Sequence, residues 1–326
     1  MSPPTLVLCW SIIIALCAAR VDAADAAVAP GMRGVAIGTA GSPYGFAEYV
    51  PPRYATAATA TFPLVITLHG MGTDGSGQDT TEIMAKVGGL GPLGLIKAGR
   101  TWFADAGAIC VNPLAPWVWW NHDTMNTFVD ALMRRYRVDA DRVYINGCSM
   151  GGAGTTGYVQ HYGERIAACM PDAVAFNPSP GDGATFATVP TWSFHAWGDT
   201  VCPLFPLETG QSAARAEPYP HGSSTILWMD EIAGHINGSK SRTTLIANYP
   251  NKGSATIAAS ETATANYSTA KGWTWVKGVD ATSGPLAKFT IYAGGHHGWN
   301  PAYDSKPVWQ WLFAQRRKAA PPAGAR

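Results

Sequence analysis

The stretch Arg142-Val-Tyr-Ile-Asn-Gly-Cys-Ser-Met-Gly-Gly152 decides the fold of this chain. A short apolar strand leads into Gly147-Cys-Ser-Met-Gly151, and small residues then open a helix. The turn between them is so sharp that a side chain at either flanking position would clash, so glycine is needed at both. Such a turn leaves the Oγ of Ser149 exposed beside free N–H groups and the positive end of a helix dipole. The stretch therefore predicts a nucleophilic serine.

Strand and helix patterns alternate on both sides of this stretch. A segment of alternating polarity at residues 44–50 ends at two prolines and reads as an early antiparallel strand. Apolar runs typical of buried strands occur at residues 62–68, 108–112, 166–170, 191–195 and 286–292, and helices are expected at 94–100, 125–136 and 308–317. The alternation predicts an α/β fold with a mostly parallel central sheet, helices on both faces, and ligands beyond the carboxyl ends of the strands.

The composition fits one large folded domain. Of the 326 residues, 47% are hydrophobic and only 14% are charged, which allows a sizeable core and argues against disorder. We expect a single catalytic domain over residues 24–318, with a Thr-, Ser-, Ala- and Gly-rich insertion at about 205–285 that is part helix and part strand. Residues 319–326 are expected to form a disordered tail.

The N-terminus carries an apolar run over residues 6–19, followed by Val21-Asp-Ala23. The run is short for a membrane span, and the small residues after it suggest a secretory signal, residues 1–23, cleaved near Ala23. An N-terminal anchor is the alternative. We expect a secreted protein, extracellular or periplasmic, with no membrane association once the signal is removed. The formal net charge of +1 argues against nucleic acid as a partner.

Four cysteines remain after signal removal: Cys110, Cys148, Cys169 and Cys202. The sequence leaves their pairing open, although a disulfide between Cys148 and Cys202 is a hypothesis if their loops meet. There is no C-x-x-C or H-E-x-x-H spacing. We therefore expect no metal, and no cofactor.

A serine hydroxyl needs a base to take its proton and a third group to orient that base. The chain offers Ser149, Asp199 and His296 in that order, which is the order of the α/β-hydrolase arrangement. Asp199 follows an expected strand end, and Asp172, after the preceding strand, is the competing acid. His296 and the adjacent His297 follow two glycines after the last strand, and one of them is expected to be the base.

The turn His69-Gly-Met71 follows the strand at residues 62–68 and should lie beside the serine. The backbone N–H groups of Met71 and Met150 are expected to form an oxyanion hole. The other histidines are interpreted as structural or surface residues: His69, His122, His161, His195, His221 and His235.

Three tryptophans crowd the loop after the expected strand at residues 108–112: Trp117, Trp119 and Trp120. That loop lies on the catalytic side of the predicted sheet. One interpretation is packing beneath the insertion, and the other is an aromatic platform for an aromatic, sugar or polymer substrate.

Several motifs together resemble the secreted "predicted peptidase" or carboxylesterase group of α/β-hydrolases. They are Tyr44-Gly-Phe-Ala-Glu-Tyr-Val-Pro-Pro52, Pro63-Leu-Val-Ile-Thr-Leu-His-Gly70, Leu95-Ile-Lys-Ala-Gly-Arg100, the run from Val138 to Gly152, and Gly295-His-His-Gly-Trp-Asn-Pro-Ala-Tyr303. The group is related to polyhydroxybutyrate depolymerases, feruloyl and acetylxylan esterases and dienelactone-hydrolase-like proteins. The resemblance covers about residues 40–200 and 286–315, and the chain departs from it at Cys148 and in the enlarged segment after Asp199.

The resemblance implies an α/β-hydrolase fold, with His296 as the base and Trp299 and Tyr303 following at the family spacing. We expect Trp299 to contact the substrate. The expected function is a secreted serine ester hydrolase of carboxylesterase or polyester depolymerase type, working through a covalent acyl-enzyme on a polymeric or bulky ester. A serine peptidase, a feruloyl or acetylxylan esterase and a non-catalytic binding protein are the alternatives. The oligomeric state stays open.

Overall fold

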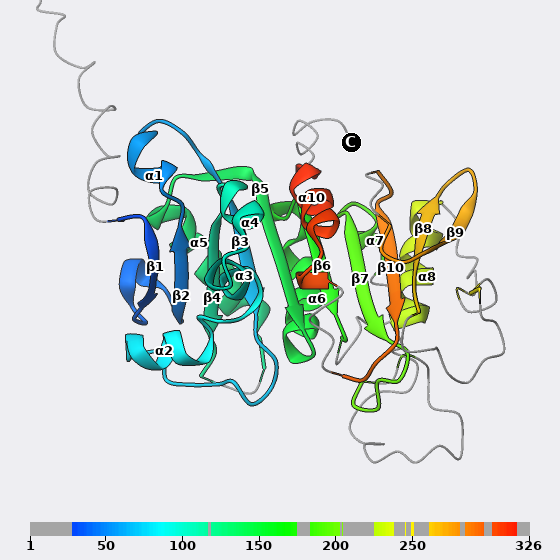
Figure 1. Cartoon of the computed structure of the whole chain (residues 1–326), viewed down its shortest axis with the longest axis horizontal. Helices are drawn as coiled ribbons and strands as arrows, with labels where there is room; N and C mark the ends of the chain where they lie inside the picture. The colour runs from blue at the N-terminus through cyan, green and yellow to red at the C-terminus, as the bar shows by residue number, and fades with distance from the viewer. Residues whose placement is uncertain are drawn as a thin grey trace, which may run out of the picture.

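The protein is built around one ten-stranded sheet. Its computed structural model describes residues 28–116, 119–174, 183–202, 204, 225–237, 245, 249–250, 261–280, 284–296 and 302–317. The strands lie in the order β1-β2-β4-β3-β5-β6-β7-β10-β8-β9, as Figure 1 shows. They are β1 (Gly31–Val35), β2 (Gly45–Val50), β3 (Phe62–Leu68), β4 (Ile109–Leu114), β5 (Val138–Cys148), β6 (Ala168–Asp172), β7 (Thr191–Ala196), β8 (Thr262–Ser268), β9 (Gly272–Lys277) and β10 (Ala287–Tyr292).

The six central strands β4, β3, β5, β6, β7 and β10 pair in parallel, and the strands outside them on each flank pair antiparallel. Parallel strands end at the same edge of a sheet, and in Figure 1 the arrows of β5, β7 and β10 point to the lower edge. The loops after all six central strands therefore meet at one edge, where ligands bind in sheets of this kind.

Helices cover both faces of the sheet. The described helices are α1 (Arg53–Thr56), α2 (Thr80–Lys86), α3 (Gly91–Lys97), α4 (Thr101–Asp105), α5 (His122–Arg135), α6 (Met150–Tyr162), α7 (Gly183–Phe186), α8 (Thr225–Ile236) and α10 (Lys306–Ala314), with short 3-10 turns η2 (Thr39–Gly41) and η3 (Gly163–Arg165). One core lies between the sheet and α5, α6, α7 and α8. The other lies between the sheet and α2, α3, α4 and α10. Each central strand is thus buried on both faces, which explains the continuous apolar runs in its sequence.

The expected strands and the three expected helices are present, with ends shifted by a few residues. The expected antiparallel strand is β2, which pairs with β1 and β4. Within the insertion, the hairpin β8–β9 extends the sheet beyond β10, and the segment before it forms the helix α8, so the described part contains both helix and strand. The predicted signal at residues 1–23 and the tail at 319–326 lie outside the described residues.

Elements the sequence pattern missed are short or lie at the sheet's edge. They are β1 and the short helices α1, α2, α4 and α7. α2 begins at an Asp79 cap whose side chain accepts the N–H of Thr81.

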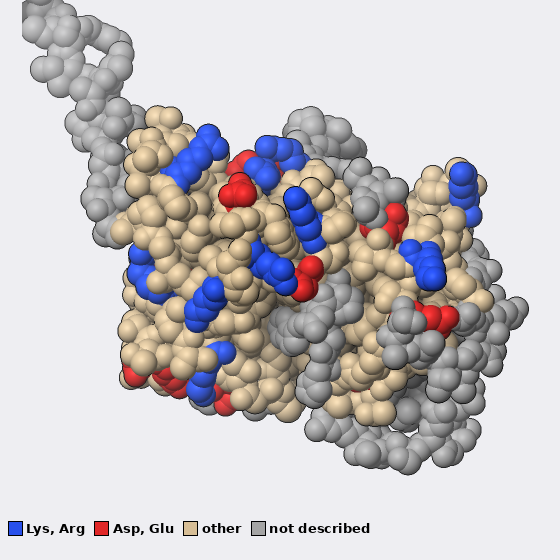
Figure 2. Space-filling view, viewed as in Figure 1, with Lys and Arg blue, Asp and Glu red and all other residues tan. Residues whose placement is uncertain are grey.

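Figure 2 shows positive and negative side chains interspersed over the face formed by α3, α4 and α10. Within the described ranges, every helix is too short or too polar to cross a lipid bilayer.

Candidate active site

Ser149 occupies a strained turn between β5 and α6. Its φ of 59° and ψ of −120° lie outside the regions that residues with a side chain usually adopt, at a cost of about 1–3 kcal/mol. A Cβ on Gly151 would overlap the Leu68 carbonyl, and one on Gly147 would overlap the Gly151 carbonyl. The two flanking glycines therefore let β5, the turn and α6 pass close to β3, as the sequence predicted.

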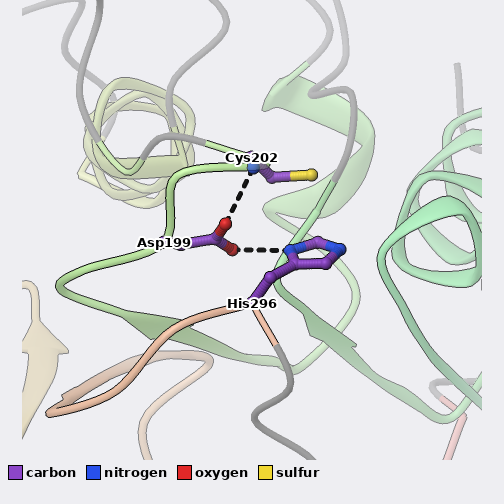
Figure 3. A group of neighbouring side chains, drawn as sticks. All are labelled: Asp199, Cys202 and His296. Atoms are coloured by element: carbon purple, nitrogen blue, oxygen red, sulfur yellow. Dashed lines mark hydrogen bonds and ion pairs between the residues drawn. The ribbon is translucent and has the colours of Figure 1, made fainter. Parts of the chain in front are cut away.

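Ser149, His296 and Asp199 form a continuous line of hydrogen bonds. The Ser149 Oγ lies 2.9 Å from His296 Nε2, and His296 Nδ1 lies 2.8 Å from Asp199 Oδ2. Because a carboxylate can only accept, Nδ1 carries the proton, and Nε2 is left to accept from the serine hydroxyl. Figure 3 shows the Asp199 carboxylate between the Cys202 backbone and the His296 ring.

Sheet order brings the acid and the histidine together. β10 pairs with β7 in parallel, with Tyr292 opposite Ala196. Pairing continues past the strand ends, because Gly198 N–H donates to the Gly294 carbonyl at 3.1 Å. A Cβ on Gly198 would lie 2.9 Å from that oxygen, so the glycine permits the close approach. Asp199 and His296 therefore follow neighbouring strands, although 97 residues separate them.

The Asp199 carboxylate is held by four donors. Its Oδ1 accepts the N–H groups of Val201 at 2.9 Å and Cys202 at 2.8 Å, and its Oδ2 faces His296. The same Oδ2 lies 3.4 Å from Nε2 of His195. Burial alone would raise the pKa of Asp199, but hydrogen bonds from His195, His296 and the Cys202 backbone hold it below its usual range. Asp199 is therefore negatively charged at neutral pH.

Asp172, the competing acid, lies elsewhere in the site. It is the last residue of β6, its side chain is fully buried, and its Oδ1 accepts from the Tyr292 hydroxyl at 3.3 Å. Burial, together with the nearby negative Asp199, raises the pKa of Asp172 well above its ordinary value, which favours the neutral form of this carboxyl. Its backbone carbonyl accepts the N–H of Ser149 at 3.0 Å. The structure thus brings Asp199, and not Asp172, to His296.

The expected oxyanion donors belong to the turn after β3 and to the start of α6. A Cβ on Gly70 would lie 3.6 Å from Ser149 Cβ, so the turn leading to Met71 runs beside the nucleophile. Met150 is the first residue of α6, where an N–H has no acceptor one turn earlier in the helix. His69 anchors this turn: its Nδ1 donates to the Gly70 carbonyl at 2.8 Å, and its Nε2 accepts the Ala115 N–H at 3.0 Å.

The three loop tryptophans do not share one environment. Trp120 Nε1 donates to the His69 carbonyl at 3.1 Å, and its ring packs edge-on against Tyr44 and His69. Trp119 is 43% exposed. Trp117, like Trp299 and His297, lies outside the described residues. Trp120 is therefore packed against the turn at His69, which fits the packing interpretation. Trp119 is the more exposed of the two.

The four cysteines in the part of the chain that the structure describes form no disulfide. Cys110, Cys148, Cys169 and Cys202 are all buried, and the hypothesis of a disulfide between Cys148 and Cys202 is wrong. The metal-ligating atoms of Asp199, Cys202 and His296 lie within 4.8 Å of one another (Figure 3). A cation there would have to displace the hydrogen bond between Asp199 and His296. The expectation of no metal stays a prediction.

Two contacts escaped the sequence interpretation. His195, taken as a structural or surface residue, is fully buried and touches Asp199. The available signal was its position at the end of the same strand, four residues before the acid. Tyr303 is buried and donates to Asn146 Oδ1 at 2.8 Å, which ties the segment after His296 to the nucleophile strand β5.

Similar folds occur among solved structures of esterases. A thermostable esterase aligns over 84% of this chain with a TM-score of 0.51 and 19% identity, and the alignment spans 59% of that protein. An acetyl xylan esterase from Aspergillus awamori aligns over 86% of this chain and 98% of its own, with a TM-score of 0.49 and 14% identity. A ferulic acid esterase aligns over 52% of this chain and 79% of its own, with a TM-score of 0.39 and 17% identity. No family model and no curated protein matches the sequence.

At these identities the likeness concerns the fold. The parallel centre of the sheet, the serine turn between β5 and α6, and the overlap with the thermostable esterase identify an α/β-hydrolase fold. The expected fold class is confirmed.

Proposed function

We propose that this protein is a serine ester hydrolase. Ser149 is the nucleophile, His296 the general base and Asp199 the residue that orients the base. The observation that carries the proposal is the unbroken hydrogen-bond line from Ser149 Oγ through His296 to Asp199, starting at a serine held in a strained turn. The esterase fold of the similar structures supports this choice of bond.

In the acylation step, Ser149 Oγ attacks the ester carbonyl carbon and His296 Nε2 takes the serine proton. The N–H groups of Met71 and Met150 are the proposed donors to the oxyanion, a role worth about 3–4 kcal/mol per donor in the transition state. His296 then gives its proton to the departing alkoxide, which leaves as the alcohol. The product is an acyl ester on Ser149.

In the second step, a water molecule loses a proton to His296 and attacks the acyl carbon. Ser149 regains that proton as the acid leaves, so the protein returns to its starting state. Asp199 stays ionised throughout and stabilises the imidazolium that forms twice per turnover. No group beyond the chain and water is needed for this proposed cycle.

A panel of substrates tests the proposed bond specificity. We expect rapid hydrolysis of short-chain p-nitrophenyl esters and slow or no cleavage of peptide anilides. The reason is that the amine of an anilide must be protonated before it can leave, whereas p-nitrophenolate leaves readily. Faster cleavage of the anilides would favour the peptidase alternative, and no turnover of either would favour a binding protein. Feruloylated and acetylated polysaccharides and polyesters extend the panel to the carbohydrate and polymer classes.

The edge around Ser149 supports a bulky, apolar substrate. Three large hydrophobic side chains in the loops after central strands are exposed: Met71 by 50%, Trp119 by 43% and Val201 by 39%. They follow β3, β4 and β7, whose ends meet at the edge that carries Ser149. Exposed apolar side chains that gather at one edge can mark a ligand-binding surface. A polymeric or bulky ester is therefore the proposed substrate.

Replacing Trp119 by alanine is expected to slow hydrolysis of a polyester or of an aromatic or sugar-linked ester by about 3- to 10-fold, the value of one aromatic contact. Turnover of p-nitrophenyl acetate should change less than about twofold, because it is too small to reach the side chain. The thermal midpoint should change little, since Trp119 is 43% exposed and is less tightly packed than a core residue.

Two matched variants control this comparison. Ile37→Ala removes a side chain that is 38% exposed beside the outermost strand β1, and it should affect neither substrate. Trp120→Ala removes a packed ring, so both rates and the thermal midpoint should fall together. Equal losses on both substrates in the Trp119 variant would contradict the platform.

A secreted location is part of the proposal. Its support is the apolar run and the small-residue site within residues 1–23.

A further inference from the structure

His195 lies at the carboxyl end of β7 and makes three polar contacts although it is fully buried. Its Nε2 lies 2.7 Å from the Cys202 carbonyl oxygen and 3.4 Å from Asp199 Oδ2. Its Nδ1 lies 3.0 Å from the hydroxyl of Thr225. Because the carbonyl and the carboxylate can only accept, Nε2 carries the proton and is shared between them.

The second nitrogen fixes that tautomer. With Nε2 protonated in a neutral ring, Nδ1 is an acceptor, and the Thr225 hydroxyl is its donor. Thr225 is the first residue of α8 and is fully buried. The chain of contacts therefore runs from α8 through the His195 ring to the loop that carries Asp199.

The loop after β7 is held at both ends by these contacts. Asp199 Oδ1 draws in the N–H groups of Val201 and Cys202, and His195 holds the Cys202 carbonyl from the other side. Asp199 Oδ2 is left between two imidazole rings, His296 at 2.8 Å and His195 at 3.4 Å. The carboxylate can rotate little without losing a donor.

We infer that His195 is a positioning residue for the catalytic acid: its Nε2–H fixes the carboxylate of Asp199, and Thr225 on α8 fixes the His195 tautomer. This rests on the proposed function of Ser149, Asp199 and His296. The segment before β10 then contributes to the site, because Thr225 on α8 supplies the hydroxyl that bonds His195. His195 touches neither the serine nor the substrate in this arrangement.

The inference has an electrostatic consequence. A neutral N–H that donates to Asp199 Oδ2 stabilises the carboxylate and weakens its electrostatic interaction with the His296 ring. Without this donor, the full charge acts on the His296 ring and favours its protonated form, which cannot accept the serine proton. Activity should then be lost at a higher pH on the acid side of the profile.

Other titratable groups face Asp199 from the neighbouring strands. Burial raises the pKa of Cys148 on β5 and of Tyr292 on β10, so both are uncharged at neutral pH. Burial also raises the pKa of Asp172 on β6 well above its ordinary value. The Cys202 thiol lies on the same loop as Asp199. On α8, Asp230 accepts from Trp273 and Leu245, and Glu231 lies 3.8 Å from His235.

The test compares His195→Leu with His195→Gln. Leucine fills similar space without a polar atom, whereas the glutamine amide can place an N–H near the position of Nε2. We expect kcat to fall about tenfold or more in His195→Leu, as for loss of a donor to a charged group, with KM nearly unchanged. The acid limb of its kcat/KM profile should move up by about half a pH unit. His195→Gln should recover most of kcat and of the limb position.

Thr225→Val and Thr67→Val form a second pair. Both threonines are fully or almost fully buried, but the Thr67 hydroxyl has no partner among the described residues. We expect Thr225→Val to lower kcat several-fold and Thr67→Val to leave it unchanged. The thermal midpoints of all four variants distinguish a loss of fold from a loss of positioning. Cys202→Ala in each background tests whether the Cys202 thiol contributes to the measured pH profile.

Two outcomes would overturn the inference. One is a wild-type kcat and acid limb in His195→Leu. The other is a loss of kcat that follows the thermal midpoint alone, with an unmoved limb and no recovery in His195→Gln. Failure of the proposed function is distinguishable, because it would appear as full ester hydrolysis in Ser149→Ala whatever the His195 variants do.

Discussion

Replacing Ser149 by alanine is expected to lower kcat for p-nitrophenyl esters by about 10⁵- to 10⁶-fold, the loss seen when a nucleophile of this kind is removed. The reason is that the hydroxyl, which lies 2.9 Å from His296 Nε2, supplies the covalent acyl intermediate. Steady-state rates with the ester and a fluorophosphonate label followed by peptide mapping give the two readouts. The label should sit on Ser149 in the native protein and be absent from the variant.

The fold of the alanine variant should be intact, because the side chain is small and the turn is built by Gly147 and Gly151. Near-native thermal midpoints would confirm that activity was lost through chemistry. Retained hydrolysis in Ser149→Ala, or labelling at another residue, would rule out this serine as the nucleophile.

Replacing Asp199 by asparagine is expected to lower kcat by about 10⁴-fold. The asparagine amide can donate to His296 Nδ1, which would move the ring proton to Nε2 and leave no acceptor for the serine hydroxyl. The loss should appear in kcat more than in KM, since Asp199 lies behind the histidine.

Asp172→Asn is the matched control. Burial raises the pKa of the Asp172 carboxyl well above its ordinary value and so favours its neutral form, and a neutral amide of the same shape should therefore change little. We expect a loss of less than about tenfold, because the amide can keep a hydrogen bond with the Tyr292 hydroxyl. A larger loss from Asp172→Asn than from Asp199→Asn would mean that the acid was wrongly assigned.

Much of the fold could be predicted because the central strands are buried on both faces. A strand such as β3 is then apolar without interruption, and its sequence differs from that of any loop or surface helix. Elements at the margin carry no such signal. β1 contains two glycines and is only partly buried, so tertiary pairing with β2 and not composition makes it a strand.

The aromatic loop illustrates the limit on side-chain assignments. Trp119 and Trp120 are adjacent and identical in type, and sequence reasoning assigned them the same two possible roles. In the structure, Trp120 is tied to the His69 carbonyl and packs on Tyr44, whereas Trp119 is exposed. Which neighbour turns inward depends on β2 and β3 lying on either side of β4, and this is a long-range property.

The sequence by itself determined the serine turn. Gly147, Ser149 and Gly151 are close in the chain, and the clash that requires glycine arises wherever a strand turns sharply into a helix against a neighbouring strand. The order of serine, acid and histidine along the chain was also visible. Only the tertiary structure decided that Asp199 and not Asp172 meets His296, because β10 pairs with β7 while β6 pairs with β5 and β7. The contact of His195 with Asp199 has the same origin, since α8 must fold back onto β7 before Thr225 can reach the ring.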